Sequence, residues 1–257
     1  MTHDPSREYR TVGIQYSDTP AERRPDQTFN RPTLDQGVLM AKQQRAIRTR
    51  RLILDSAATM IERNGYTATS IDGISTTAGT TKGAVYFHFP SKGDIAAALF
   101  DEAHDSLRAI ATRARGPEAS PLQSLIDTTH LLVRQFNGDP VTRACIQLCL
   151  ERHSPAPQAR AYRLTWASTV RLLLESAAAR REFREGVSAH AVAALVISMG
   201  AGAELLAGRE GRMLRPHMTT AMWRVILPGL VTPKHAATLH PEGSPGIQLA
   251  DPSPQAR

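Results

Sequence analysis

Apolar side chains recur at helical spacing of three and four residues from about Gln44 to Asn64, and Gly65 follows as a stop signal. The same spacing dominates the chain after residue 91, and alternation at period two is absent throughout. The pattern therefore predicts an all-α fold without a sheet. The predicted helices span residues 44–64, 69–77, 81–87, 91–114, 120–136, 139–153, 158–181 and 188–207, and a last helix ends near residue 230.

Glycine, proline and capping residues separate these helices. Asp139-Pro140, for example, combines a helix cap with proline at the first helical position, and Gly208 to Gly211 is expected to end the penultimate helix. Residues 1–39 and 232–257 are rich in proline and lack apolar periodicity, so both are expected to be disordered. The predicted division is a disordered extension (1–39), a DNA-binding domain (40–92), a helical ligand-binding and dimerisation domain (93–231) and a disordered tail (232–257).

Residues 67 to 92 contain two short predicted helices joined by a turn. Thr69 is the expected N-cap of the first helix, with Asp72 near its positive end, and Gly79 breaks that helix. Thr80 is the expected cap of the second. Two short helices joined by a glycine-containing turn are typical of the helix-turn-helix motif, whose second helix enters the major groove of DNA. An ordinary helical hairpin with incidental polar residues is the alternative.

The motif supplies candidate DNA contacts of three kinds. Polar side chains at the start of the second helix can reach bases and phosphates, small residues allow close approach, and later polar side chains suit phosphate oxygens. The predicted DNA-binding residues are Arg45, Arg48, Thr69, Thr80, Thr81, Lys82, Gly83, Ala84, Tyr86, His88 and Lys92. The apolar residues predicted to form the core behind them are Ile71, Ile74, Ala78, Val85, Phe87 and Phe89.

Charge supports this assignment. The formal net charge is +7, and residues 41–92 alone carry +5. A basic region of this kind attracts phosphate and gives salt-dependent affinity for DNA, although arginine-rich surfaces also occur for solubility alone. Residues 1–39 carry a net charge of −1, which argues against a DNA-binding arm. Translation could also start at Met40, just before the first predicted helix.

The run from Ile53 to Phe100 resembles the N-terminal domain of TetR-type transcriptional repressors. The resemblance rests on ungapped matches that include Gly65-Tyr66, Ala78-Gly79, Thr81 to Ala84, Tyr86 to Phe89 and Ser91-Lys92. Within that family, residues 85–89 and Lys42 to Arg45 resemble the γ-butyrolactone autoregulator receptors of actinobacteria. The resemblance implies a homodimer that binds double-stranded operator DNA and is released by a small hydrophobic ligand such as a γ-butyrolactone, butenolide or furan.

The resemblance also indicates where the ligand would bind. The receptors place a tryptophan over the ligand at the position of Trp166, which offers a flat ring and one N–H donor; a core or dimer-face tryptophan is the alternative. Gln147, Ser198 and Met199 are secondary candidates, because polar groups on apolar faces need partners when buried. Ala103 replaces a polar contact of some relatives, so a regulator that senses an antibiotic or another small molecule remains the alternative function.

Other functional classes find little support. No hydrolase, metalloprotease or phosphate-loop motif is present, and the glycines of residues 199–203 do not fit the dinucleotide-binding pattern. We therefore expect no enzyme, no catalytic residues, no cofactor and no metal site. An architectural DNA binder would leave the long helical segment 93–231 without a role. Cys145 and Cys149 are expected to be reduced thiols, and no apolar run is long enough to span a membrane, so we expect a cytoplasmic protein without a membrane partner.

Overall fold

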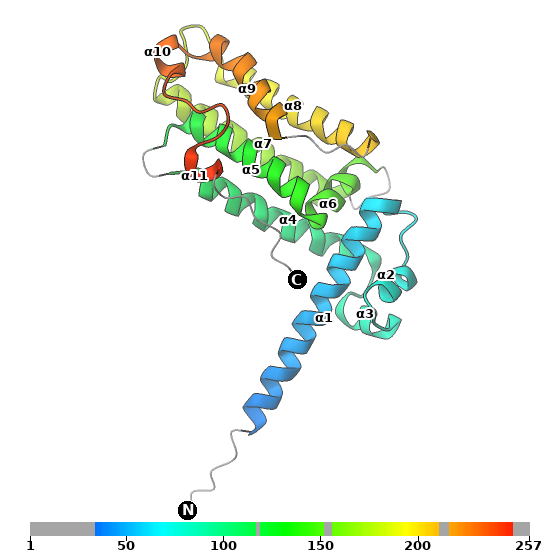
Figure 1. Ribbon diagram of the computed structural model, residues 1–257. Coiled ribbons are helices and arrows are strands. Elements are labelled where there is room, and N and C mark those ends of the chain that lie inside the picture. Colours follow the sequence, from blue (N-terminus) through cyan, green and yellow to red (C-terminus); the bar gives the residue numbers. More distant parts are fainter. Residues whose placement is uncertain (1–33, 117–118, 152–155, 211–215, 249–257) are drawn as a thin grey trace, which may run out of the picture. The chain divides into compact units, whose positions relative to one another are not determined.

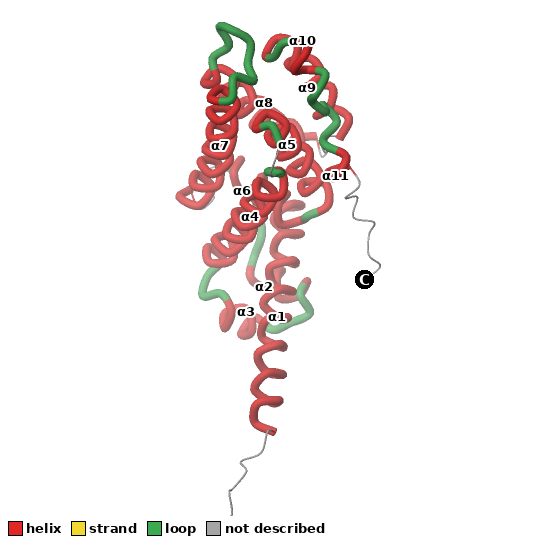
Figure 2. The backbone as a smooth tube through the Cα atoms, turned by 90° about the vertical axis from the view of Figure 1, so that its left-hand side faces the viewer, coloured by secondary structure: helices red, strands yellow, loops and turns green. Residues whose placement is uncertain are grey.

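The computed structural model describes residues 34–116, 119–151, 156–210 and 216–248, and these residues form helices joined by loops, with no strand (Figures 1 and 2). The predicted all-α class is therefore confirmed. The helices are α1 (Leu34–Asn64), α2 (Ile71–Thr77), α3 (Lys82–His88), α4 (Lys92–Ala114), α5 (Pro121–Gly138), α6 (Pro140–Leu150), α7 (Ala156–Ala179), α8 (Ala189–Glu210), α9 (Pro216–Leu230), α10 (Pro233–Ala236) and α11 (Pro245–Gln248).

The chain divides into two compact units between Lys42 and Gln43. In the first unit, residues 34–42 are already helical, so the prediction that the whole segment 1–39 is disordered is wrong for residues 34–39. Residues 1–33 lie outside the described part of the chain. In the second unit, the predicted helix boundaries agree with the structure to within a few residues for most of the helices.

Side-chain caps fix where the helices of the second unit begin. The side chains of Ser91, Ser120 and Asp139 accept hydrogen bonds from the first turns of α4, α5 and α6, as predicted. The caps of α2 and α3 are Ser70 and Thr81, each one residue later than predicted. The shift has a structural cause at α2, because the Thr69 hydroxyl donates instead to the Gly65 carbonyl at 2.7 Å.

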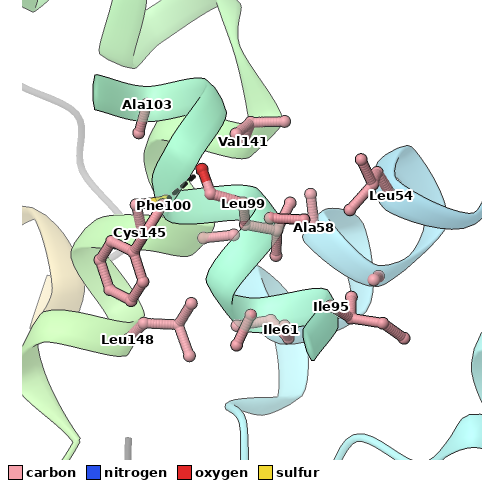
Figure 3. Packing of buried hydrophobic residues seen from close by; sticks show 14 of the residues in the cluster. Leu54, Ala58, Ile61, Ile95, Leu99, Phe100, Ala103, Val141, Cys145 and Leu148 are labelled. Carbon is pink, nitrogen blue, oxygen red and sulfur yellow. Dashed lines mark hydrogen bonds between the residues drawn. The ribbon is translucent and has the colours of Figure 1, made fainter. Parts of the chain in front are cut away.

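One hydrophobic core joins the helix-turn-helix motif to helices α4 to α9, which we call the body. It contains buried side chains of α1, α3, α4 and α6, and Phe89 just after α3. Figure 3 shows Leu54, Ala58 and Ile61 of α1 facing α4, with Leu148 of α6 close by. Burial of this apolar surface stabilises the arrangement, so the first three helices do not form an isolated domain.

A second core lies within the body, where α5, α7, α8 and α9 pack against one another (Figure 1). Its buried side chains include Leu125, Val170, Val196 and Trp223. Helix α8 continues through Gly208 to Glu210, so the predicted break at Gly208 is wrong. A single glycine costs a helix only about 1 kcal/mol, so Gly208 by itself does not have to end the helix.

The predicted disordered tail is also wrong for residues 232–248, in which α10 packs against α9 and residues 240–248 pack along α5. The buried carboxylate of Asp127 accepts hydrogen bonds from the backbone N–H and the hydroxyl of Ser244 at 2.8 and 2.7 Å. Gln123 exchanges two hydrogen bonds with the backbone of His240, and His130 bonds to the Pro241 carbonyl at 2.8 Å. Sequence periodicity misses this segment because polar contacts, and not a regular apolar face, hold it in place.

Replacing Asp127 by alanine is expected to lower the free energy of unfolding by about 1–3 kcal/mol, because buried donors would lose their acceptor. At this chain length, each kcal/mol lowers the melting temperature by about 2–4 °C, which thermal unfolding monitored by circular dichroism would detect. Asp105→Ala is the control, since the Asp105 side chain is 79% exposed. Equal melting temperatures for the two variants would contradict a stabilising role for the tail.

Candidate DNA-binding helix and ligand cavity

Gly79 makes the turn between α2 and α3, and its φ of +61° is a conformation that favours glycine. The Thr80 N–H donates to the Ser75 carbonyl across this turn at 2.9 Å. Ile74 and Val85 are fully buried and anchor the two helices to the core. The structure thus brings the two helices together as the helix-turn-helix pattern predicts.

Helix α3 presents an exposed face. Tyr86 and Phe87 are 46% and 81% exposed, so the prediction that Phe87 belongs to the core is wrong. A Cβ atom added at Gly83 would meet only the Thr81 hydroxyl at 3.9 Å. Because Gly83 and Phe87 are four residues apart, they lie on the same side of the helix. The protein itself has room for a side chain at position 83. A glycine at this position would instead allow a binding partner to approach the helix closely.

Lys82 lies in the first turn of α3 with its ammonium in solvent. It forms an ion pair with Asp72 of α2, at 2.9 Å between Nζ and Oδ1. The hydrogen bond and charge of Asp72 raise the pKa of Lys82 above its ordinary value. Exposed ion pairs contribute only about 0–1 kcal/mol, so this lysine is free to exchange its partner for a phosphate or a base.

Two predicted DNA contacts face the interior of the protein. Thr69 is 1% exposed and its hydroxyl is engaged with Gly65. The Lys92 ammonium donates to the carbonyls of Tyr66 and Thr69, both at 2.9 Å, and lies 4.4 Å from the centre of the Tyr66 ring. Both side chains therefore bind the loop that precedes α2. Burial of Thr69 contradicts its predicted DNA contact, whereas the contact of the partly exposed Lys92 stays a prediction.

The other predicted contacts of α3 lie at the surface or partly buried. Thr81 caps α3 with its side chain, and Ala84 is half-buried. The half-buried ring of His88 packs edge-on against Phe87. Burial, together with the charge of Arg50, lowers the pKa of His88 below its ordinary value and so favours the neutral imidazole.

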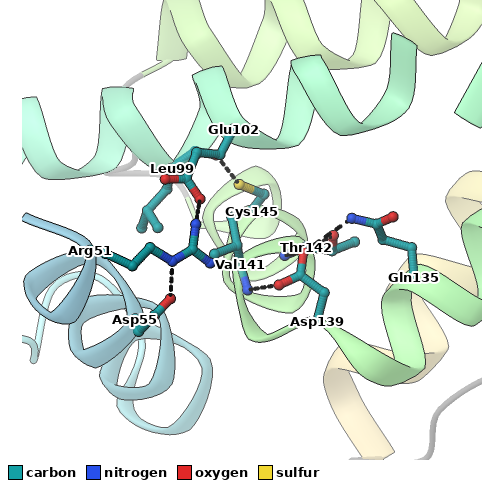
Figure 4. A network of polar contacts seen from close by, with 9 residues as sticks. All are labelled: Arg51, Asp55, Leu99, Glu102, Gln135, Asp139, Val141, Thr142 and Cys145. Carbon is teal, nitrogen blue, oxygen red and sulfur yellow. Dashed lines mark hydrogen bonds and ion pairs between the residues drawn. The ribbon is translucent and has the colours of Figure 1, made fainter. Parts of the chain in front are cut away.

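The arginines of α1 differ in their surroundings. Arg45 and Arg48 are exposed, as a DNA contact requires. Arg50 stacks over the Phe89 ring at 4.2 Å. Arg51 binds Asp55 at 2.9 Å and Glu102 of α4 at 2.7 Å (Figure 4). Burial raises the pKa of Glu102, an effect that the Arg51 charge opposes.

The body contains a partly open apolar cavity of about 140 Å³, to which helices α4 to α9 all contribute. An engineered apolar protein cavity of about 150 Å³ holds benzene, so this space suits a small ring-bearing compound. Trp166 and Met199, both predicted ligand contacts, line it. The remaining lining residues are Leu107, Thr129, Leu132, Val133, Phe136, Thr142, Ile146, Tyr162, Val196, Gly200, Ala203, Thr219, Met222 and Trp223.

The cavity contains few polar groups. The Trp223 indole donates to the Thr129 hydroxyl at 2.8 Å. The Trp166 indole N–H donates no hydrogen bond within the described part of the chain. A Cβ atom at Gly200 would lie 3.3 Å from that nitrogen, so the small residue on α8 lets the indole pack closely. The Trp166 N–H is therefore available to a ligand acceptor.

The other two predicted ligand contacts are wrong. The Gln147 amide donates to Glu151 at 3.4 Å and the residue lies outside the cavity lining. Ser198 is exposed on α8. Both errors arise because a polar residue on an apolar helix can face another surface. Sequence reasoning missed Trp223, Thr129 and Tyr162; the scarcity of tryptophan in the chain was the one available signal for Trp223.

Cys145 and Cys149 are reduced thiols, as predicted. The Cys145 thiol donates to the Leu99 carbonyl at 3.3 Å (Figure 4), and burial raises its pKa well above the ordinary value. Among the described residues, no group of acidic, histidine and cysteine side chains could hold a metal ion. None of the described helices is both long and apolar enough to cross a bilayer.

The two-helix motif with its outward α3 defines a helix-turn-helix protein, and three comparisons give its family. The model of the tetR family of bacterial regulatory proteins matches residues 53–99. The A-factor receptor protein of Streptomyces griseus is 32% identical over 208 residues, which cover 79% of this chain and 71% of that receptor. The chain therefore belongs to the tetR family.

Two solved structures extend the similarity over the body. A γ-butyrolactone receptor described as ArpA-like has 27% identity and a TM-score of 0.64, with 76% of this chain and 94% of that chain covered. CprB from Streptomyces coelicolor, in complex with its biological operator sequence, has 29% identity and a TM-score of 0.63 with the same coverage. The similarity to γ-butyrolactone receptors inferred from residues 42–45 and 85–89 is confirmed.

Proposed function

We propose that this protein is a transcriptional repressor that binds palindromic operator DNA as a homodimer and is released by a small hydrophobic signal such as a γ-butyrolactone, butenolide or furan. We further propose that it controls genes of secondary metabolism. One observation carries this proposal: a single unit of the chain combines an exposed recognition helix with an apolar cavity. The similarity to an A-factor receptor and to γ-butyrolactone receptors supports the same ligand class.

The exposed faces of α8 and α9 support the homodimer. Leu195 and Leu205 are exposed on α8, and Met218 and Val225 on α9. Each pair fits a stripe along one side of its helix, and Ser198 lies on the α8 stripe. Two copies of this surface would form a four-helix bundle with two-fold symmetry. The two α3 helices would then read half-sites about 34 Å apart.

Release requires that the ligand prefers a state of the dimer in which the distance between the two α3 helices does not match the operator. A ligand with equal affinity for both states shifts nothing, and a change from 1:99 to 99:1 requires about 5.5 kcal/mol of differential binding. The cavity is suited to supply this difference, because α4 contacts both sites. Its N-terminal half packs against helices α1 to α3, and its Leu107 lines the cavity.

A gel-shift assay with DNA from the upstream region of the protein's own gene tests this function. We expect a shifted band that disappears when a synthetic 2-acyl-γ-butyrolactone is titrated into the mixture. A band that persists at saturating lactone, or a protein that remains monomeric in analytical ultracentrifugation, would contradict the proposal. An extract of the producing organism replaces the lactone in a second titration and tests whether the natural signal belongs to another chemical class.

Phe87 is expected to contact a thymine methyl group in the operator, because an exposed aromatic ring beside Gly83 offers an apolar surface in the major groove. Phe87→Ala should therefore weaken operator binding about 5- to 30-fold, which corresponds to about 1–2 kcal/mol. Replacing operator thymines by deoxyuridine removes only the methyl group. This replacement should weaken binding of the unaltered protein but not of the variant, and equal losses for both proteins would exclude the contact.

A further inference from the structure

Helix α6 and its C-cap contain residues that contact either the cavity or the head, by which we mean helices α1 to α3 and the loops between them. Thr142 and Ile146 line the cavity. Two other residues bind the head. Arg143 contacts Glu62 of α1, and Glu151, the C-cap of α6, contacts the loop between α1 and α2. The helix has 11 residues with proline only at its first position, so it has no internal kink. A displacement at the cavity would therefore move both head contacts together.

Glu151 binds the loop that leads into α2. Its carboxylate accepts hydrogen bonds from the backbone N–H groups of Tyr66 at 2.7 Å and Thr67 at 3.4 Å. The loop approaches Glu151 closely, since a Cβ atom at Gly65 would lie only 2.7 Å from the carboxylate, and Gly65 has a φ of +82°. Hydrogen bonds to an ionised acceptor are stronger than those between neutral groups, so this contact fixes the loop to α6.

The same loop is held from its other side by α4. Lys92 donates to the carbonyls of Tyr66 and Thr69, while Glu151 binds the amides of Tyr66 and Thr67. Ser70, the cap of α2, follows immediately. The position of the helix-turn-helix motif is thus determined by two body helices that both border the cavity.

Arg143 provides the second contact between α6 and the head. Its guanidinium binds Glu62 of α1 at 2.8 Å and also donates to the Phe136 and Asn137 carbonyls at the end of α5. Phe136 itself lines the cavity. This pair resists rotation of α1 against the body, whereas the Glu151 contact acts directly on the start of α2.

Resting on the proposed function, we propose that Glu151 is the positioning residue through which cavity occupancy changes the orientation of the helix-turn-helix motif. A ligand that displaces Thr142 and Ile146 moves the end of α6, and the two hydrogen bonds from Glu151 carry the movement to the loop before α2. This role implies that lactone and operator each change the affinity of the protein for the other. Such a coupling typically amounts to a factor of about 5–150 in affinity.

The test compares Glu151→Ala, Glu151→Gln and the control Glu175→Ala, whose side chain is exposed on α7. A duplex selected by the unaltered protein from a random pool serves as operator, and a synthetic 2-acyl-γ-butyrolactone as ligand. Calorimetry gives the lactone dissociation constant with and without duplex, and the ratio is the coupling factor. Glu151→Ala should keep the affinity of the free protein for lactone within about twofold but lose most of the coupling factor. Glu151→Gln retains an acceptor for the Tyr66 amide and should retain most of the coupling.

An unchanged coupling factor in Glu151→Ala overturns the inference. If the unaltered protein itself shows no coupling, the proposed function fails for this ligand class, and hydrogen exchange then decides the role of Glu151 independently. In the duplex complex, the amides of residues 71–77 should exchange faster in Glu151→Ala than in Glu151→Gln and Glu175→Ala. Equal exchange in all three proteins would show that Glu151 does not position the motif.

Discussion

Replacing Lys82 by alanine is expected to abolish operator binding and leave the fold intact. Lys82 is exposed in the first turn of α3, where a lysine can reach phosphates and guanine edges. A specific contact of this kind contributes about 1–3 kcal/mol, and a dimer loses two of them, so the dissociation constant should rise at least 30-fold. A gel shift measures the loss. Circular dichroism should show unchanged helicity, because the ion pair of Lys82 with Asp72 lies at the surface and adds little to stability.

Asp72→Asn is the matched variant. It removes the negative charge that holds Lys82 and would repel phosphate, while the amide keeps a similar shape. We expect operator affinity to stay the same or to rise, with the largest difference at low salt, where charge effects are least screened. Operator binding by Lys82→Ala at the strength of the unaltered protein would show that α3 is not the recognition helix.

Replacing Trp166 by alanine is expected to preserve operator binding and to remove release by ligand. Trp166 lines the cavity, and its N–H is available to an acceptor on the ligand. Loss of a large aromatic contact and one hydrogen bond should weaken lactone binding by about 3–4 kcal/mol, or more than 100-fold. Titration of lactone into the shifted complex measures this change, and release at the normal lactone concentration would exclude this cavity as the ligand site.

Trp166→Phe separates the two contributions of this side chain. Phenylalanine keeps an aromatic surface but has no N–H donor, so the loss should be about 1–2 kcal/mol if the hydrogen bond to the ligand forms. Thermal unfolding of both variants provides the control for stability, because Trp166 also packs between the two cores. An alanine variant that unfolds at the assay temperature would be replaced in the titration by Trp166→Phe, whose smaller expected shift remains measurable.

Several parts of the molecule follow from local rules in the sequence. Ser91, Ser120 and Asp139 have side chains that cap helices, so the starts of α4, α5 and α6 are encoded within a few residues. Gly79 encodes the turn of the motif because its positive φ disfavours other residues. The exposed position of Lys82 also follows from its place beside the cap, whereas the contact of Lys92 with the loop before α2 does not.

The sequence by itself determined the helical class, most helix boundaries, the recognition motif and one wall of the cavity at Trp166 and Met199. Only the tertiary structure decided that Phe87 points outward, that Gln147 and Ser198 do not line the cavity, and that residues 240–248 lie along α5. The reason is physical. Helix caps and turns depend on neighbours a few residues away, whereas the partner of Asp127 or of Glu151 comes from a segment roughly a hundred residues away in the chain, and no local pattern specifies which face of a helix such a partner will cover.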